Sequence, residues 1–181
     1  MTRSYHIEEL PLPGLKRIQI PVFHDDRGFF SEAFSEKKFA DAKLPHRFVQ
    51  MNRSRSKAGT LRGLHYQRNP WQGKLITVLS GKIWDVVVDL RPGPTQGKSF
   101  AIELTDDGNW LYVPGGFAHG FCVLGEAHAD VLYQVDQPYD ASKESGICWD
   151  DPTLNIQWPI KPKWISEKDR QLPKYSSTSF L

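Results

Sequence analysis

The sequence predicts an all-β protein made of two packed sheets, arranged as a sandwich or a barrel. Short runs rich in β-branched and aromatic residues recur about every 8–12 residues along the chain. The 14 glycines and 13 prolines are spread between these runs and mark their ends. Only two segments carry a helical signature. Many short strands with few helices are typical of a double-sheet sandwich or barrel.

The expected strands follow one another from residue 16 to residue 149. Tight turns are expected at Ser80-Gly81 and Asp107-Gly108, and an Asp-Gly pair between apolar runs is typical of a hairpin. By their β-branched and aromatic content, the strands are Lys16–Phe23, Gly28–Phe34, Arg47–Arg55, Thr60–Gln67, Leu75–Ser80, Lys82–Leu90, Ser99–Leu104, Asn109–Val113, His119–Leu124, Ala129–Val135 and Gly146–Trp149.

Two segments are predicted to be helical. Ser35–Lys43 fits one short helix, with Ser35 as the N-cap and Phe39 packing inward. Ser166 can open one further turn near the C-terminus. Because Ser166 and Asp169 fit the Ser-x-x-Asp pattern of a helix start, Asp169 is by default a capping residue. The tail from residue 174 to residue 181 is Ser-rich, and we expect it to be frayed.

Length and composition indicate a single domain spanning residues 1–181. Hydrophobic residues make up 39% and charged residues 24%, which excludes a disordered chain. No apolar run reaches the roughly 18 residues that a membrane helix needs. The N-terminus offers no apolar stretch for a signal peptide, so we expect a cytoplasmic protein.

Charge and cysteine content narrow the class of function further. The formal net charge of +2 is too balanced for a protein that binds nucleic acid through bulk charge. Arg53, Arg55 and Lys57 alternate along one run, but a solvated strand face explains them. Cys122 and Cys148 form no metal-binding pattern and argue against a disulfide scaffold.

The residues that could carry chemistry gather in a few short clusters. Arg62 and His65 are three positions apart in one predicted strand, so strict alternation places them on opposite faces. Gly63 could introduce a bulge that brings them together. Each candidate also has an ordinary structural explanation, since Lys74 fits a solvated turn and a lone histidine is more often a satisfied core residue. Arginine and lysine in one cleft would indicate an anionic ligand, but the residues alone leave the reaction open.

Seven segments of the chain, taken together, are similar to the dTDP-4-dehydrorhamnose 3,5-epimerase family, a branch of the cupins. They occur in the family's order from about residue 10 to residue 173. A single one of these motifs would be weak, whereas the ordered set is specific. The segments are Asp26–Glu32, Phe48–Asn52, Leu61–Gln67, Gln72–Lys74, Pro114–Phe121, Glu144–Gly146 and Ser166–Asp169.

The resemblance implies a cupin-type double-stranded β-helix, a jelly roll with one or two short helices. The general cupin metal site uses two histidines and a glutamate from its first motif and a histidine from its second. Here the first motif has only His65, Gln67 takes the place of the second histidine, and His119 keeps the later position. The resemblance therefore implies an enzyme with no metal and no other cofactor.

The activity implied by the resemblance is an isomerisation of a dTDP-linked 4-keto-6-deoxy sugar. The enzyme would invert the carbons on both sides of the ketone and give dTDP-4-dehydro-L-rhamnose, on the route to dTDP-L-rhamnose. A single-centre epimerase and a 3,4-ketoisomerase on a related sugar share the motifs and stay open as alternatives. A non-catalytic sugar- or nucleotide-binding module would be expected to lack His65 or Asp169, and both are present.

The resemblance assigns catalytic roles to four residues. His65 matches the base that removes the proton next to the ketone, and Asp169 matches the carboxylate that holds its imidazole. Lys74 matches the cation at the ketone oxygen. Tyr133 matches the acid on the far face of the sugar, and a phenol with a pKa near 10 is protonated at pH 7.

The other matching positions belong to the substrate pocket. Arg62 matches a contact to the sugar or pyrophosphate. Arg27, Phe30 and Glu32 match the nucleoside end, which the family often supplies from a second subunit, so the resemblance implies a homodimer with strand exchange. The remaining pocket positions are Gln50, Asn52, His119, Tyr139, Glu144 and Lys168.

Overall fold

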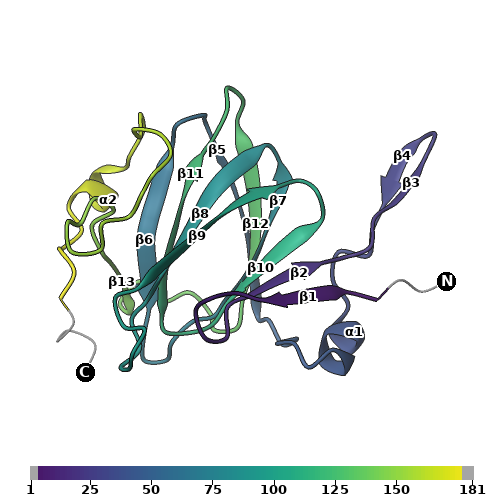
Figure 1. The fold of residues 1–181 in the computed structure, drawn as a ribbon, viewed down its shortest axis with the longest axis horizontal. Helices are drawn as coiled ribbons and strands as arrows, with labels where there is room; N and C mark the ends of the chain where they lie inside the picture. The colour runs from purple at the N-terminus through teal and green to yellow at the C-terminus, as the bar shows by residue number, and fades with distance from the viewer. Residues whose placement is uncertain (1–3, 177–181) are drawn as a thin grey trace.

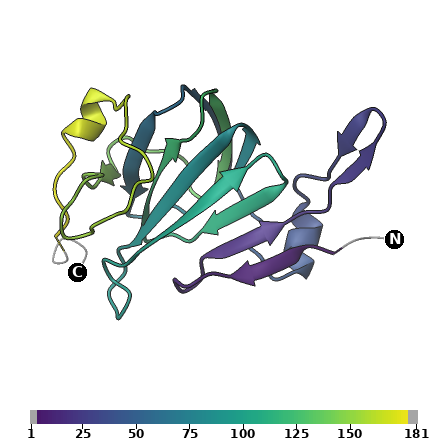
Figure 2. The ribbon, with the colours of Figure 1, turned by 45° about the horizontal axis from the view of Figure 1, so that its top comes forward.

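Two antiparallel sheets packed face to face form the body of the protein in the computed structural model, which describes residues 4–176 (Figures 1 and 2). The prediction of an all-β, double-sheet fold is confirmed. The larger sheet has six strands, in the spatial order β1 (His6–Glu9), β2 (Lys16–Gln19), β10 (Asn109–Val113), β7 (Lys74–Ser80), β12 (Ala129–Val135) and β5 (Gln50–Ser56).

The smaller sheet has five strands and lies against the inner face of the first. Its spatial order is β13 (Glu144–Gly146), β6 (Leu61–Gln67), β11 (Phe117–Val123), β8 (Lys82–Asp89) and β9 (Ser99–Thr105).

From β5 to β13, consecutive strands mostly alternate between the two sheets, as they do in a jelly roll. The turns at Gly81 and Gly108 are present, with φ of 84° and 82°. The prediction of a hairpin at Asp107-Gly108 is wrong, because β9 and β10, the strands on either side of this turn, belong to opposite sheets. The turn after Ser80 likewise connects β7 in one sheet to β8 in the other, so these two strands do not pair with each other. A turn signal reports a local reversal of the chain and carries no information on which strand lies alongside.

Most strand ranges agree with the prediction to within a few residues, and two do not. The run Lys16–Phe23 is divided between β2 and a separate strand, because Pro21 has no N–H to continue a ladder. The run Gly146–Trp149 is wrong as a strand, since β13 ends at Gly146 and the N–H of Cys148 donates to the carbonyl of Pro173. Strand β1 was not predicted.

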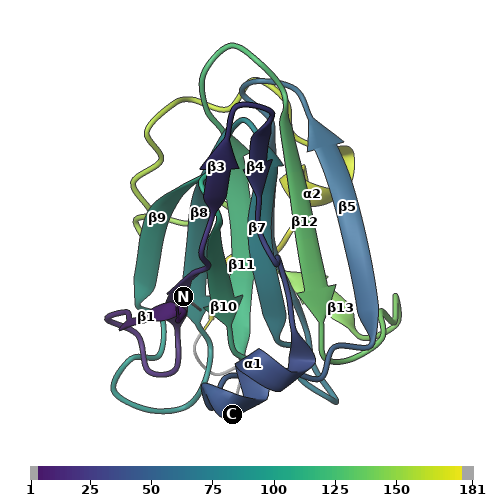
Figure 3. The same cartoon turned by 90° about the vertical axis from the view of Figure 1, so that its right-hand side faces the viewer.

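A small hairpin of β3 (Phe23–Asp25) and β4 (Gly28–Phe30) projects from the sandwich (Figure 1). The expected helix is present as α1 (Glu36–Asp41), with the Ser35 side chain accepting from an N–H of the first turn. It packs at one end of the outer face of the six-stranded sheet (Figure 3). None of the helices within residues 4–176 has the length and apolar character to cross a membrane.

The second helix, α2 (Glu167–Arg170), lies beside β6 near the C-terminus and begins at the predicted cap, Ser166. Lys174 and Tyr175, expected to be frayed, are held in place. The Lys174 ammonium is 3.2 Å from the Asp150 carboxylate, and the Tyr175 N–H donates to Asp151 at 2.8 Å. The rest of the predicted tail, residues 177–181, lies outside the described residues.

Apolar side chains fill one part of the space between the sheets. Ile76 and Val78 from the six-stranded sheet pack against Val87, Phe117 and Phe121 from the other. The outer faces are covered as well, by α1 on one sheet and by the segment after β13 on the other. The sandwich is therefore closed on both faces, and the unfilled part of its interior is left for a binding site.

Candidate functional site

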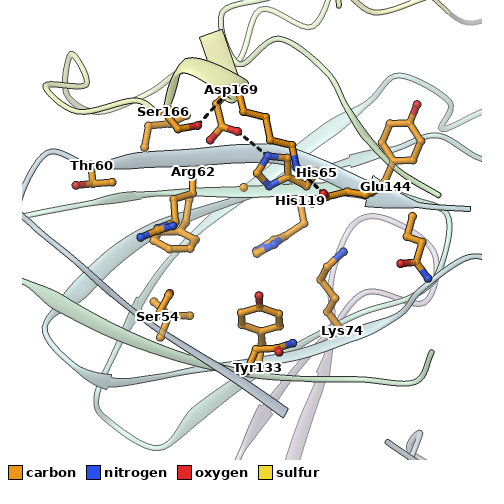
Figure 4. Close-up of a pocket in the computed structure, with 18 of the residues that line it drawn as sticks. Ser54, Thr60, Arg62, His65, Lys74, His119, Tyr133, Glu144, Ser166 and Asp169 are labelled. Carbon is orange, nitrogen blue, oxygen red and sulfur yellow. Dashed lines mark hydrogen bonds and ion pairs between the residues drawn. The ribbon is translucent and has the colours of Figure 1, made fainter. Parts of the chain in front are cut away.

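A cavity of about 740 Å³ opens between the two sheets (Figure 4). Strands β6 and β11 form one wall, β5, β7 and β12 form the other, and α2 lies at the rim. This volume is within the usual range for a small-molecule site. The structure brings all but three of the predicted site residues together there, namely Gln50, Asn52, Arg62, His65, Lys74, His119, Tyr133, Tyr139, Glu144, Lys168 and Asp169.

His65, which is half-buried, forms a pair with the buried Asp169 although the two are far apart in sequence. His65 Nε2 lies 2.7 Å from Asp169 Oδ1, so this nitrogen donates to the carboxylate and Nδ1 is left for the cavity. Burial by itself would raise the pKa of Asp169, but the hydrogen bond and charge of His65, with the N–H of Gly63, hold it below its usual value. The carboxylate is therefore ionised beside the imidazole.

The capping and pairing interpretations of Asp169 turn out to be compatible. The Ser166 hydroxyl caps α2 by accepting the Asp169 backbone N–H at 3.0 Å. The Asp169 carboxylate does not return to the cap and instead accepts from His65 and from the Gly63 N–H at 3.1 Å. The short helix thus serves to fix this carboxylate behind His65.

The predicted bulge in β6 is present. His65 lies opposite His119 on β11, whereas Arg62 lies opposite Phe121, so β6 holds one extra residue between these positions. Both Arg62 and His65 consequently line the cavity despite their odd spacing. Gly63 has φ of 117°, and a Cβ on it would lie 2.7 Å from Gly120 Cα, so the bulge requires glycine.

Lys74 is the first residue of β7, and its side chain runs into the cavity with only 9% of the residue exposed. Among the described residues its ammonium group has no hydrogen-bond or ion-pair partner. Burial lowers the pKa of Lys74 to about 8, while the carboxylates of Asp136, Glu144 and Asp85 act in the opposite direction. A cation with no partner at the wall of a cavity is well placed to receive a negatively charged oxygen.

Tyr133 stands on the opposite wall from His65. It is carried by β12, next to Asn52 on β5, and its hydroxyl points across the cavity toward the imidazoles (Figure 4). Burial raises the pKa of Tyr133, with the charge of Arg62 opposing this effect. The phenol is therefore protonated at neutral pH and can donate a proton.

His119 also lies in the cavity, and it has a carboxylate partner that the sequence did not indicate. His119 Nε2 is 2.8 Å from Oδ2 of Asp85, on the adjacent strand β8. Asp85 is completely buried. Asp85 stands at an inward position between Ile83 and Val87, but both faces of this strand are apolar, so alternation alone could not assign its direction.

Polar residues form a network at one end of the cavity. Tyr139 donates its hydroxyl to Glu144 at 2.9 Å, and Lys168 forms an ion pair with the same carboxylate. Gln50 donates to Asn52 at 2.8 Å and accepts the Tyr139 N–H at 2.9 Å. Burial would raise the pKa of Glu144, but the hydrogen bonds from Lys168 and Tyr139 hold it below its usual value.

Several lining residues were missed. Ser54 follows Gln50 and Asn52 at the alternating positions of β5, so the period of two could have found it. Others had no local signal, because non-local packing brings them to the cavity. They include Trp164 and Arg170.

Arg27, Phe30 and Glu32 do not reach this cavity. Arg27 and Phe30 belong to the projecting hairpin and its turn, where Arg27 forms an ion pair with Asp25 at 2.5 Å. Phe30 is 69% exposed. Glu32 pairs with Lys38 at 2.9 Å. Within one chain the structure therefore separates the predicted nucleoside end from the rest of the site.

The described part of the chain contains no group of three or more His, Cys, Asp or Glu side chains placed to hold a metal ion. Each of the two histidines in the cavity uses its Nε2 to donate to a carboxylate. What the site does hold is a set of proton-transfer groups, with an imidazole and a phenol on opposite walls and a cation beside them.

The chain matches the family model described as dTDP-4-dehydrorhamnose 3,5-epimerase over residues 9–177. It belongs to this family. The epimerase of that name from Pseudomonas aeruginosa is 44% identical over 166 residues, which cover 90% of this chain and 91% of the relative.

Two solved structures of the family have nearly the same fold. The dTDP-4-dehydrorhamnose 3,5-epimerase of Bacillus anthracis, solved with TDP and pyrophosphate bound, is 44% identical with a TM-score of 0.90 over 95% of this chain and 100% of that one. The dTDP-6-deoxy-D-glucose-3,5-epimerase of Legionella pneumophila, solved with dTDP-4-keto-L-rhamnose, is 39% identical with a TM-score of 0.89 over 94% and 93%.

Proposed function

We propose that this family member is a dTDP-4-dehydro-6-deoxy-D-glucose 3,5-epimerase that forms dTDP-4-dehydro-L-rhamnose. The observation that carries the proposal is the placement of His65, paired with Asp169, across the cavity from Tyr133, with Lys74 beside them. These are the groups that inversion next to a ketone requires. The relatives that carry this name support the choice of substrate.

The first step is removal of a proton from the carbon next to the ketone. Such a hydrogen is acidic because the electron pair left behind spreads onto the carbonyl oxygen as an enolate. Nδ1 of His65 takes the proton, while Nε2 stays bonded to Asp169 and the carboxylate stabilises the imidazolium that forms. General base catalysis of this kind contributes roughly 10²–10⁴-fold to the rate.

The enolate oxygen needs a positive group that is in place before the reaction. Lys74 fills this role because its ammonium group has no other partner among the described residues. It therefore needs little rearrangement when charge develops on the oxygen. Donors of this kind contribute about 10²–10³-fold each.

Inversion requires the new proton to arrive on the opposite face of the ring. Tyr133 is on the wall opposite His65, so its phenol donates to the enolate carbon from that side. His65 then loses its proton to solvent and Tyr133 regains one. No atom changes its overall oxidation state in this sequence, so the proposed reaction uses proton transfers alone.

The nucleotide part of the substrate requires a second subunit in this proposal. Arg27, Phe30 and Glu32 lie on or next to a projecting hairpin that leaves their own cavity. Phe29 and Phe30 are 66% and 69% exposed there, and an isolated monomer gains nothing from exposing two aromatic rings. We propose a homodimer in which each hairpin is exchanged with the partner and completes the partner's site.

We also propose a cytoplasmic location. Both Cys122 and Cys148 are free thiols, and unpaired cysteines are usual in a reducing compartment.

The direct test is turnover of dTDP-4-keto-6-deoxyglucose in heavy water, followed by NMR of the product. We expect deuterium at both carbons next to the ketone, and dTDP-L-rhamnose when a rhamnose-pathway reductase and NADPH are added. Turnover without any solvent deuterium would exclude the enolate mechanism.

The same spectra distinguish the alternatives. Inversion at one carbon would identify a single-centre epimerase, and a ketone moved to the neighbouring carbon would identify a 3,4-ketoisomerase. Binding of the nucleotide sugar without any exchange would identify a non-catalytic module.

A further inference from the structure

Asp85 is a carboxylate at the centre of the protein. It lies on β8, between β11 and β9 in the five-stranded sheet, and none of its surface is exposed. Its side chain points into the sandwich from between Ile83 and Val87, which belong to the apolar core. One oxygen accepts from His119, and the other, Oδ1, has no hydrogen-bond partner in the described residues and no access to solvent.

A contribution to folding stability does not explain why a carboxylate occupies position 85. A buried charge with an unpaired oxygen is costly, and an apolar side chain of similar size at the same place would favour folding. Asp89, on the same strand and equally buried, illustrates the difference. Its Oδ1 accepts a hydrogen bond from Arg91, and its Oδ2 accepts from Arg91 and from the Thr95 hydroxyl. A polar group that weakens the fold and adjoins a site indicates a role in that site.

Among the described residues, the one side chain that forms a hydrogen bond with Asp85 is His119, a wall residue of the cavity. His119 lies opposite His65 in the strand register, so the two imidazoles stand side by side. Because Asp85 accepts from Nε2, the His119 ring is fixed with Nδ1 toward the cavity. The arrangement repeats that of His65 and Asp169 on the neighbouring strand.

Asp85 also acts on Lys74 through its charge, as the smallest of three carboxylate contributions that raise the pKa of Lys74. Burial raises the pKa of Asp85 itself, while the hydrogen bond and charge of His119 and the charge of Lys74 oppose that rise. Three carboxylates face the buried ammonium group from three elements, namely Asp136 after β12, Glu144 on β13 and Asp85 on β8. Asp136 already accepts the Gly73 N–H, and Glu144 already binds Tyr139 and Lys168. The other titratable or charged side chains that line the cavity around Lys74 are Arg62, His65, Tyr66, His119, Tyr133, Tyr139, Lys168, Asp169 and Arg170. Asp85 is the one carboxylate of the three with a fully buried oxygen that has no hydrogen-bond partner in the described structure.

We propose that Asp85 is a positioning residue for the epimerisation, which orients His119 through its hydrogen bond and keeps Lys74 in its ammonium form through its charge. The inference rests on the proposed function for the role of Lys74 at the ketone oxygen. It assigns to Asp85 no contact with the substrate.

The variant Asp85→Asn tests the proposal, because it keeps the size of the side chain and removes the charge. Loss of a nearby negative charge makes an ammonium group easier to deprotonate, so Lys74 should titrate at lower pH. We expect the alkaline limb of the kcat profile, near pH 8 for the native protein from the pKa of Lys74, to move down by about one pH unit. The effect on KM should be smaller than the effect on kcat.

Direct titration of Lys74 by NMR, with ¹³C-labelled lysine and with Lys74→Gln to assign the signal, should show the same shift without any substrate. Asp85→Ser removes the same charge with a smaller side chain and should behave alike, so the test does not depend on one variant folding. The matched control is Asp89→Asn, on the same strand, which should leave both the Lys74 titration and the alkaline limb where they are.

Two results would overturn the proposal. One is a Lys74 titration that is the same in the folded Asp85 variants as in the native protein. The other, measured on the native protein alone, is a ¹⁵N spectrum that shows His119 carrying its hydrogen on Nδ1 rather than Nε2. Neither measurement needs turnover. A native protein with no epimerase activity would therefore refute the proposed function. The Lys74 titration and the His119 spectrum would still test the role of Asp85 by themselves.

Discussion

At the scale of single residues, Lys74 shows a conflict between stability and chemistry. Folding lowers its pKa from 10.5 to about 8 because the ammonium group is buried. At about 1.4 kcal/mol for each pKa unit, this costs about 3 kcal/mol of folding free energy. The cost is fully present below pH 8, and it fades as the pH rises toward 10.5, where the unfolded chain also loses its proton.

We therefore predict that Lys74→Met is more stable than the native protein at pH 7, by about 3 kcal/mol at most. The gain should shrink between pH 8 and pH 10.5, and the variant should lose about 10²–10³-fold in kcat. Urea unfolding at pH 7 and pH 10 measures the first effect. Lys98→Met, at an exposed lysine, is the control and should change stability by no more than about 0.5 kcal/mol. A variant less stable than the native protein at pH 7 would contradict the prediction.

His65 and Tyr133 should be separable by isotope exchange, because they act on opposite faces of the sugar. In His65→Ala, both deuterium uptake and product formation should fall by about 10²–10⁴-fold. In Tyr133→Phe the base is intact, so deuterium should still enter the substrate on the original face while inversion is lost. NMR of the recovered sugar in heavy water distinguishes these results. Equal loss of exchange and inversion in Tyr133→Phe would remove the phenol from the role of donor.

The residue scale also shows what local sequence can and cannot reveal. His65, Lys74 and Tyr133 were candidates by their chemistry and by their family motifs, and the structure places them in one cavity. Asp85 was passed over, because in an otherwise apolar strand one carboxylate is compatible with either face until the register is known. Its importance depends on a contact with His119, which comes from a different strand.

At the scale of the elements, the bulge in β6 is the feature on which the geometry of the site depends. Without the extra residue, Arg62 and His65 would face opposite sides of the sheet. Gly63 has a positive φ and lies so close to β11 that a Cβ would be 2.7 Å from Gly120 Cα and 2.8 Å from the His119 carbonyl. Neither neighbour is the end of a flexible side chain, so the strands would have to separate.

We predict that Gly63→Ala loses at least about 10²-fold in kcat, since displacements of about 1 Å have effects of that size. Backbone strain adds a loss of stability of about 1–3 kcal/mol. Gly125→Ala is the matched control, because Gly125 also has a positive φ, 76°, but nothing lies within 4 Å of its added Cβ. The Gly125→Ala control should have the same backbone strain as Gly63→Ala but keep the kcat of the native protein. Gly63→Ala with native kcat would show that the bulge does not set the position of His65.

The elements divide into those that local sequence specifies and those that it does not. Both helices begin at the predicted serine caps, because a cap is formed within one turn of chain. The partners of the strands were not predictable, and the expected hairpin at Asp107-Gly108 was wrong, because pairing is decided by residues far apart in sequence. Local chemistry located the turns, and the closure of the sandwich decided what they connect.

At the scale of the whole molecule, the site as predicted is larger than one chain supplies. The cavity holds the proton-transfer groups, while Arg27, Phe30 and Glu32 lie outside it. The sequence could indicate that these residues take part through its resemblance to the family, but composition and spacing say nothing about which copy of the chain they serve. The arrangement of the subunits in the dimer decides which copy these residues serve. Two inactive variants can test this arrangement.

Mixing His65→Ala protein with an Arg27→Ala/Phe30→Ala variant should restore activity if the hairpins are exchanged. After unfolding and refolding together, about half of the dimers are hybrids, and each hybrid has one site with the native His65 and a native hairpin from the partner. About a quarter of the native kcat should therefore return, although each variant alone is inactive. The same mixture without refolding is the control. If each hairpin instead serves its own chain, or if light scattering finds only monomers, every site keeps a defect and no activity can return.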